Sequence, residues 1–402
     1  MVSIGIDVSK GKSTVFAMDE LGVVHMTPTE FEHTKSSLQK LILKIREMPE
    51  PVKVVLENTG YYHWPLVNAL LDADIFVCIV NSLIMNKFAK VAMRPGKTDP
   101  LDAVMICRFG LEKWNSLVRC TPEAEARKML RLYSREYSSA VKLMSQQKVH
   151  LRCLLDQTMP GIQTLLCDEG GRSKLCDFVV KFWHFDNISK KKEDNFISTY
   201  CQWAKKQGYH ASESKAHAIY TLSQNGIPVL PSNKTVKFLV QEAARLLIYL
   251  EKSVETILAQ MNELASTFPE YDTVITMKGV GPKIAPRLIG EIGDIERFHS
   301  AKALVAYAGL DAPPFQSGSY ESKNRRISKR GNKYLRKIGY EITTALMSSK
   351  PTEDNAVYLF VMKKRQEGKH YLAADMAGLN KFLHIYYARV KQCCDSKMAE
   401  TA

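Results

Sequence analysis

The chain has 402 residues, 45% of them apolar, and its 56 Lys and Arg against 42 Asp and Glu give a formal net charge of +14. A chain of this length buries roughly three quarters of its surface on folding, which excludes a disordered chain or one that needs disulfides to fold. Its nine cysteines form no C-x-x-C pair, which argues against zinc and disulfide scaffolds and indicates a reducing compartment.

The N-terminal residues MVSIGIDVSK lack the charged and apolar segments of a signal peptide, and no window approaches the eighteen or so apolar residues of a membrane span. We therefore expect a cytoplasmic protein without a membrane partner. The excess of positive charge favours a polyanionic partner, because Lys and Arg on a folded surface release counterions from phosphate backbones.

The first region alternates apolar and polar residues as strands do. Residues 2–7 predict a strand, 9–12 a turn, and 13–18 the returning strand of a hairpin. Helical and buried-strand patterns then alternate, which indicates an α/β sheet with helices packed on its faces. These later elements are a helix at 36–46, a strand at 52–57, a helix at 64–72 and a strand at 75–80.

Two long stretches in the middle of the chain repeat apolar residues at three- and four-residue steps. They cover residues 122–158 and 236–266, and their matching length and period predict an antiparallel hairpin or a dimer-forming coiled coil. Self-association as a dimer or tetramer is therefore expected. A polar insert with scattered aromatic residues, about 160–232, separates the two stretches and indicates no role of its own.

These patterns divide the chain into three regions. Residues 1–118 form the α/β domain, 119–268 the coiled-coil helices with their helical insert, and 269–402 a compact, mostly helical C-terminal domain. The last helices of the chain are expected at about 333–349, 355–366 and 371–393.

Four carboxylates stand out by position. Asp7 and Glu57 end predicted strands, and ligands of open α/β sheets bind at the carboxyl ends of strands. Asp99 and Asp102 share one face of a helix whose first turn contains Pro100. Each acid taken alone is better explained as a strand end or a helix cap. Taken together, they indicate a site where four carboxylates converge.

Converging carboxylates repel one another unless a cation lies between them. Mg²⁺ or Mn²⁺ suits oxygen ligands, and paired metals suit phosphodiester chemistry because they activate a nucleophile and stabilise the leaving oxygen. The candidate metal ligands are therefore Asp7, Glu57, Asp99 and Asp102.

Residues 275–285 resemble the turn of a helix-hairpin-helix, in which Gly279 and Gly281 let backbone N–H groups approach a phosphate. An ordinary turn between helices explains this pattern about equally well. The loop at 307–320, rich in Pro and Gly, presents several hydroxyls directly before a basic run.

A serine beside phosphate-binding cations acts as a nucleophile when a base or a metal activates it, although most loop serines have no such role. The residues alone do not separate Ser317 from Ser319 or Ser322. The basic run that follows, 323–337, has eight cations and no acid, so it can bind phosphates and stack on bases. The candidate nucleic-acid-binding residues are Lys278, Lys283, Lys323, Arg325, Arg326, Lys329, Arg330, Lys333 and Arg336.

In combination, these motifs resemble the insertion-sequence transposases that join an N-terminal DEDD RuvC-like domain to a C-terminal serine transposase domain, the bridge-RNA-guided recombinases. The resemblance runs nearly end to end. Its motifs are Gly5–Lys10 (GIDVSK), Glu57–Gly60 (ENTG), Lys97–Ala103 (KTDPLDA), Gly279–Pro282 (GVGP), Gly309-Leu310 with Gln316–Gly318 (QSG), and Ile327–Asn332 (ISKRGN).

The resemblance implies an RNase H-like N-terminal fold in which Asp7, Glu57, Asp99 and Asp102 coordinate Mg²⁺. It also implies that Ser317 attacks DNA to form a covalent phosphoserine, within composite sites that combine the acids of one protomer with the serine of another. The family's serine usually precedes a Gly-Gly pair, whereas Ser319 follows Gly318 here. The central segment is also longer than in the shorter family members.

The resemblance further implies a nucleoid-associated bacterial or archaeal enzyme with a structured guide RNA that pairs with donor and target double-stranded DNA. Base pairing then reads sequence while the protein reads shape and backbone. We therefore expect an RNA-guided DNA recombinase. The alternatives are a metal-dependent nuclease of branched DNA, which forms no covalent adduct, and a non-catalytic nucleic-acid-binding protein whose acids are structural.

Overall fold

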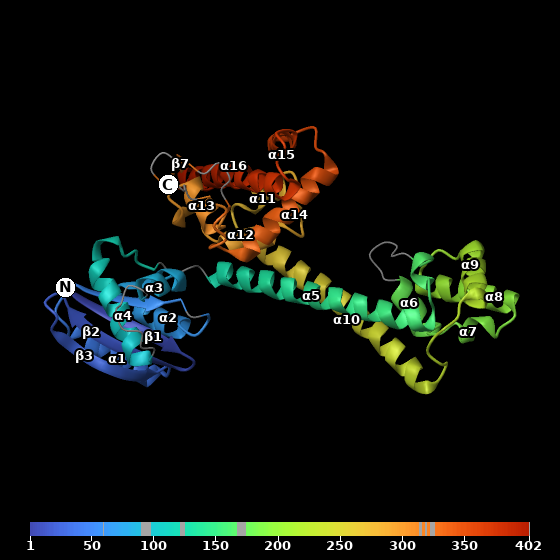
Figure 1. The fold of residues 1–402 in the computed structure, drawn as a ribbon, viewed down its shortest axis with the longest axis horizontal. Coiled ribbons are helices and arrows are strands. Elements are labelled where there is room, and N and C mark those ends of the chain that lie inside the picture. The colour runs from blue at the N-terminus through green and yellow to red at the C-terminus, as the bar shows by residue number, and fades with distance from the viewer. Residues whose placement is uncertain are drawn as a thin grey trace. The chain divides into compact units, whose positions relative to one another are not determined.

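The computed structural model describes residues 1–58, 60–89, 98–120, 125–166, 174–312, 316–317, 320–321 and 326–401. The chain forms two compact units, residues 1–123 and 124–402. Each is described by itself below (Figure 1). No helix of the described residues is long and apolar enough to cross a membrane.

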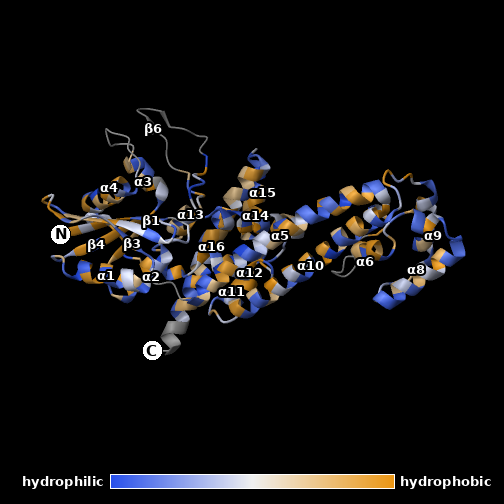
Figure 2. Ribbon diagram, turned by 90° about the horizontal axis from the view of Figure 1, so that it is seen from below, coloured by the Kyte–Doolittle hydropathy of each residue, from blue (hydrophilic) through white to orange (hydrophobic). Residues whose placement is uncertain are grey.

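The N-terminal unit is built on a mixed five-stranded sheet in the order β3-β2-β1-β4-β5. The first three strands form an antiparallel meander, and β4 and β5 run parallel to β1. Figure 2 shows that the central strands are largely apolar. The strands are β1 (Val2–Ser9), β2 (Lys12–Asp19), β3 (Val24–Glu32), β4 (Val52–Glu57) and β5 (Val77–Val80).

The sheet confirms the α/β expectation for this region, but β3 was not predicted. Only Met26 and Phe31 of this strand are buried, and Pro28 interrupts it. An edge strand with one solvated face and a proline carries little apolar periodicity, which is why its sequence gave a weak signal.

Helices cover both faces of the sheet. On one face, α1 (Lys35–Arg46) and α2 (Trp64–Asp72) bury apolar residues in one cluster with Ile4 and Ile6 of β1. The other face is covered by α4 (Asp99–Glu112), and α3 (Ser82–Ala89) packs against α4. Because strand residues alternate between faces, Ser3, Gly5 and Asp7 point away from Ile4 and Ile6.

Helix α4 approaches β1 closely because both elements present glycine. A Cβ added at Gly5 would lie 2.1 Å from the carbonyl oxygen of Ala103 and 2.3 Å from the backbone nitrogen of Cys107. A Cβ added at Gly110 would lie 2.2 Å from the hydroxyl of Ser3. The Cys107 thiol donates to the Ser3 carbonyl at 3.0 Å. The carboxyl end of β1 therefore lies next to the first turn of α4.

In the second unit, α5 (Glu125–Thr158) and α10 (Lys234–Ala265) run side by side and antiparallel, as Figure 1 shows. Gln147 Nε2 donates to the Ala243 carbonyl at 2.9 Å, and Lys148 pairs with Glu251 at 3.1 Å. This pairing within one chain is the hairpin alternative of the sequence analysis. Coiled-coil packing and self-association stay predictions.

The insert, which separates the two long helices in the sequence, is a set of short helices with its own core. Aromatic side chains fill this core, with Phe178 at the centre of ring contacts to Phe182, Tyr200 and Trp203. The helices are α6 (Lys174–Lys181), α7 (Asp186–Ser189), α8 (Glu193–Gln207) and α9 (Glu213–Asn225).

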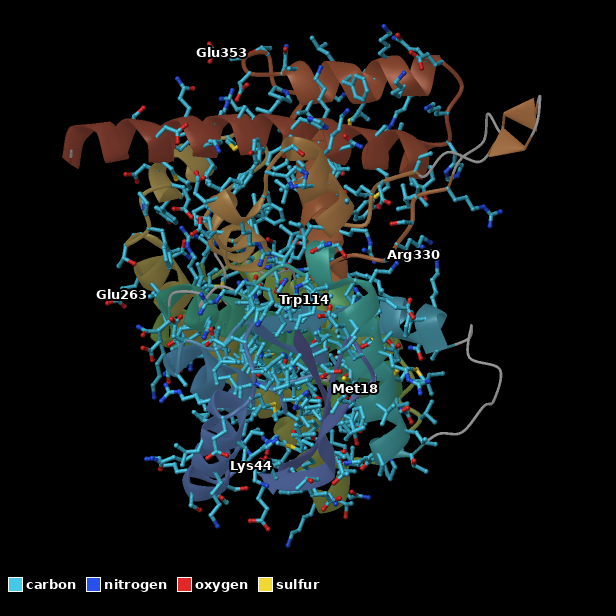
Figure 3. All side chains as sticks on the ribbon, turned by 90° about the vertical axis from the view of Figure 1, so that its left-hand side faces the viewer. Met18, Lys44, Trp114, Glu263, Arg330 and Glu353 are labelled. Carbon is cyan, nitrogen blue, oxygen red and sulfur yellow. The ribbon has the colours of Figure 1, made fainter. Side chains whose placement is uncertain are left out.

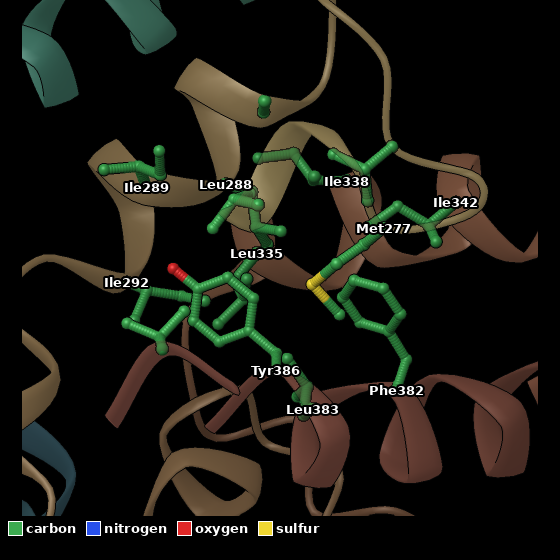
Figure 4. Close-up of a cluster of buried hydrophobic side chains, with 14 of the residues drawn as sticks. Met277, Leu288, Ile289, Ile292, Leu335, Ile338, Ile342, Phe382, Leu383 and Tyr386 are labelled. Carbon is green, nitrogen blue, oxygen red and sulfur yellow. The ribbon is translucent and has the colours of Figure 1, made fainter. Parts of the chain in front are cut away.

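The C-terminal helices pack around a second core, shown in Figure 4, in which Met277, Leu288 and Phe382 are buried. Leu130 of α5 belongs to the same core, which joins these helices to the long helical pair. The elements are α11 (Tyr271–Ile275), α12 (Ala285–Ile292), α13 (Ala301–Tyr307), β6 (Gln316–Ser317), β7 (Tyr320–Glu321), α14 (Lys333–Ser349), α15 (Ala356–Gln366) and α16 (Tyr371–Thr401).

The close approach of α4 to β1 predicts the effect of Gly5→Ala. The added methyl group would overlap the α4 backbone, so we expect the substitution to destabilise the N-terminal unit by about 1–3 kcal/mol. Calorimetric melting of the full chain measures this. Gly281→Ala is the control, because Gly281 has open space around its Cβ position and no positive φ. Equal melting of Gly5→Ala and the wild type would contradict the role given to Gly5.

Candidate functional site

Asp7 and Glu57 lie on neighbouring parallel strands at the carboxyl edge of the sheet. The register pairs Ile6 with Leu56, so the next residues of β1 and β4 are Asp7 and Glu57. Glu57 is the last residue of its strand, as expected, whereas β1 continues to Ser9 because it stays paired with β2. Asp7 therefore lies within a strand, where its backbone is fixed.

The other two acids occupy the first turn of α4. Thr98 is the N-cap residue, and Asp99, Pro100 and Asp102 follow in the first turn. Proline tolerates this position because its missing N–H has no helical partner there. Acidic residues are favoured in a first turn by the helix dipole. The contact between Gly5 and α4 brings this turn to the carboxyl end of β1.

Asp99, Asp102 and Glu57 lie close enough to Asp7 for their charges to act on its carboxyl group. The pKa of Asp7 is raised to about 6, first by burial and then by the negative charges of Asp99, Asp102 and Glu57. Such a cluster has the donor chemistry for a hard divalent cation, because all four side chains offer carboxylate oxygens. Among the described residues, however, no three acid, His or Cys side chains stand close enough to hold a metal as they are.

The predicted nucleophile lies in the second unit. Ser317 ends the two-residue strand β6 and pairs with Tyr320 of β7. Ser319 and Ser322, the two alternatives, lie outside the described residues, as do Lys323 and Arg325. Ser317 belongs to the segment between residues 312 and 326, here called the serine loop, of which the structure describes residues 316–317 and 320–321.

The two ends of this loop are joined at its base. The backbone N–H groups of Ser328, Lys329 and Asn332 donate to carbonyls of Asp311, Gly309 and Tyr307, at 2.8, 3.0 and 2.7 Å. The Ser328 hydroxyl also donates to the Asp311 carboxylate. These pairings align residues 307–311 with 328–332 and fix both ends of the serine loop.

Two glycines make this base possible. Gly309 has a φ of +67°, which favours glycine, and a Cβ there would lie 2.5 Å from the Gly331 nitrogen. A Cβ at Gly331 would lie 2.1 Å from the Tyr307 carbonyl oxygen. Arg336 donates to the carbonyls of Ala308 and Gly331, at 2.9 and 3.0 Å, and so ties the base to α14.

A buried carboxylate on α12 anchors the loop base. Glu291 of α12 is fully buried, and its Oε2 accepts a hydrogen bond from Asn332 Nδ2 at 2.8 Å. Arg135 of α5 lies 3.4 Å from the other oxygen. Asn332 also caps α14, because its side-chain oxygen accepts from the N–H groups of Tyr334 and Leu335. One asparagine thus links the loop base, α14 and α12.

Sequence reasoning missed Glu291 and the cap at Asn332. The cap could have been predicted, because an asparagine directly before a helical pattern is a typical N-cap residue. Glu291 gave no such signal, because a single acid among apolar residues does not reveal which partners surround it.

The predicted cations fall into two groups. Lys278 and Lys283 flank the turn between α11 and α12, where both are exposed. Gly279 has a φ of +81° in this turn, and a Cβ there would lie 2.8 Å from Leu346. Among the described residues of the basic run, the predicted cations Arg326, Lys329, Arg330 (labelled in Figure 3) and Lys333 are exposed.

Arg336 differs from these cations. It is half-buried, burial lowers its pKa, and it donates to two backbone carbonyls. Its guanidinium therefore supports the loop base. These contacts explain the position of Arg336 without a bound nucleic acid.

Comparison with known proteins finds similarity at both ends of the chain. A family model described as "Transposase" matches residues 4–160, and one described as "Transposase IS116/IS110/IS902 family" matches residues 271–358. The chain is 22% identical to the insertion element IS116 uncharacterized 44.8 kDa protein of Streptomyces clavuligerus, over 96% of this chain and 94% of that protein.

It is also 24% identical to the pilin gene-inverting protein of Moraxella bovis, over 97% of this chain and 95% of that protein. Among solved structures, it matches T. thermophilus RuvC in complex with a Holliday junction substrate at 12% identity, over 29% of this chain and 96% of that chain. The TM-score of that match is 0.23, which establishes no shared fold.

The raised pKa of Asp7 predicts how stability depends on pH. Between pH 4 and 6 the folded chain holds a proton on Asp7 that the unfolded chain has lost, so stability falls as pH rises through this window. At pH 7.5 the ionised Asp7 is then destabilising. We expect Asp7→Asn to be more stable than the wild type there, by about 1–2 kcal/mol after allowance for solvent screening.

Urea unfolding at pH 7.5 and at pH 4 measures this difference, which should shrink toward zero at the lower pH. Glu32→Gln is the control, since Glu32 is an exposed acid at the end of β3. Equal stability of Asp7→Asn and the wild type at pH 7.5 would show that the four acids do not repel one another as described.

Proposed function

We propose that this chain, which belongs to the IS110/IS116 family of transposases, is an RNA-guided DNA recombinase that breaks and rejoins strands through a phosphoserine at Ser317. Membership of the family makes it an enzyme that acts on DNA. The observation that carries the finer proposal is the convergence of Asp7, Glu57, Asp99 and Asp102 at one edge of the sheet.

In this proposal the four carboxylates hold Mg²⁺ or Mn²⁺. Bound there, the metal would activate the nucleophile and stabilise the oxygen that leaves the scissile phosphate. The residues fit such an ion in charge and donor type. They would have to move closer together to ligate it, since no three of the described side chains now stand at ligand distance.

The chain's own residues supply the remaining chemistry. The Ser317 oxygen attacks the phosphorus, its proton leaves, and the bond from phosphorus to one deoxyribose oxygen breaks. That oxygen takes up a proton and becomes a free hydroxyl, while the strand stays attached to Ser317 as a phosphodiester. Attack by a hydroxyl of another strand reverses these steps and releases the serine, so rejoining needs no external energy source.

The paired loop base supports this role for Ser317. Its hydrogen bonds hold both ends of the serine loop. The exposed cations Arg326, Lys329 and Arg330 lie at the C-terminal end of that loop. Cations next to a hydroxyl attract the phosphate that it attacks. Composite sites, with acids and serine from different protomers of a dimer or tetramer, belong to the same proposal.

Trapping a covalent adduct tests the nucleophile. Wild-type protein, purified with its RNA and incubated with donor and target DNA and Mg²⁺, should give a protein–DNA band on a denaturing gel. Ser317→Ala should lose the band and the recombined product, and Asp7→Asn or EDTA should reduce both at least 100-fold, since activation of the nucleophile is lost. Ser319→Ala should keep both.

Recombined product from Ser317→Ala would refute the assignment of the nucleophile. Cleaved DNA without an adduct from the wild type would instead favour the metal-dependent nuclease of branched DNA, in which water attacks.

Copurifying RNA tests the guide. When the gene is expressed with its native flanking DNA, we expect sequencing to find one discrete, structured RNA encoded in that flank. The net charge of +14 favours such a polyanionic partner. Random cellular RNA, or none, would count against guidance and leave the strand chemistry to be judged by the adduct alone.

A further inference from the structure

The net positive charge of the chain comes entirely from one of its two units. Residues 1–123 carry 14 Lys and Arg against 14 Asp and Glu, whereas residues 124–402 carry 42 against 28. The neutral unit also gathers four carboxylates at one edge of its sheet. Its charge distribution therefore gives phosphate backbones no net attraction, and nucleic acid at this edge needs another source of binding energy.

Two exposed aromatic rings lie at the same edge. Tyr61 and Tyr62, in the turn that follows Glu57 and β4, are 68% and 48% exposed. Within the described part of the chain, neither hydroxyl has a hydrogen-bond partner. Ile84 and Leu101, at the starts of α3 and α4, are also exposed. Neighbouring exposed aromatic rings offer an apolar surface that a ligand can cover.

Hydrogen bonds fix the backbone of the turn that carries the two rings. His63 is buried beneath it, and its carbonyl accepts from the N–H of Val67 at 2.9 Å. The N–H of Trp64 donates to the Tyr61 carbonyl at 3.4 Å. On the strand side, Asn58 donates to the Val80 carbonyl at 3.0 Å and accepts from the Ser82 hydroxyl at 3.0 Å. A backbone that is already fixed loses less entropy when a ligand binds to the turn.

We propose that Tyr61 and Tyr62 form a stacking platform for unpaired nucleobases at the acid edge of the N-terminal unit. Stacking suits this position because every base has a π-face, and the interaction needs no positive charge from the protein. The platform would hold the bases next to the phosphate that is cut, while the basic unit binds backbone. This inference rests on the proposed function, which supplies the nucleic acid.

Photocrosslinking of the full chain tests the platform. The probe is a single-stranded oligonucleotide with 5-iodouracil, which crosslinks to stacked aromatic rings, made as DNA and as RNA and bound in EDTA so that no strand is cut. We expect crosslinks on the peptide 54–87. Replacing both tyrosines, as Tyr61→Ala with Tyr62→Ala, should lower them at least tenfold, and the matching Phe variant should retain them.

The control is Leu21→Ala, because Leu21 is 86% exposed in the turn between β2 and β3, at the opposite edge of the sheet. Its crosslinks should equal those of the wild type. Undiminished crosslinking of the double alanine variant, or crosslinks confined to residues 124–402, would overturn the proposal. A preference for the DNA or the RNA probe would say which strand supplies the bases.

The outcome separates from that of the proposed function. The crosslink requires no metal and no Ser317. A wild type that crosslinks at 54–87 but forms no adduct would therefore support the platform and refute the phosphoserine. A wild type that forms the adduct without this crosslink loses only the platform.

Discussion

Helix α4 lies against β1 with almost no side chain between their backbones, and the acid site depends on this contact. Gly5 and Gly110 allow the approach, while the Cys107 thiol donates across it to the Ser3 carbonyl. Strand β1 runs antiparallel to α4, from Ser3 beside Gly110 to Gly5 beside Ala103, and so toward the first turn of the helix. Asp7 reaches Asp99 and Asp102 because it lies two positions after Gly5, on the same face of the strand. Residues outside the candidate site thus place the acids that form it.

Much of this arrangement could be predicted from the sequence, because it depends on local periodicity. The hairpin, the alternation of strands and helices, and the i, i+3 pair of acids are repeats of two or of three to four residues, and these periods survive in a single sequence. The strand β3 could not be predicted, since an edge strand interrupted by Pro28 buries only two side chains.

The base of the serine loop shows the other limit. Its hydrogen bonds join residues 307–311 to 328–332, and its anchor, Glu291, comes from a third element. Contacts across such separations follow no period. The glycines were the only sign of these contacts in the sequence. The backbones of Gly309 and Gly331 pack against each other, as those of Gly5 and Ala103 do in the other unit. The nature of the neighbour was not readable from the glycine alone.

The two candidate sites have complementary chemistry. The acid edge has the donors for a metal but belongs to a unit with no net positive charge. The serine loop leaves a base whose acids are engaged, Asp311 by Ser328 and Glu291 by Asn332, beside exposed cations. A scissile phosphate needs a nucleophile, cations for its charge and activation of the attacking oxygen. Each site offers only part of this set, so the proposed function would require one phosphate to meet both, from one copy of the chain or from two.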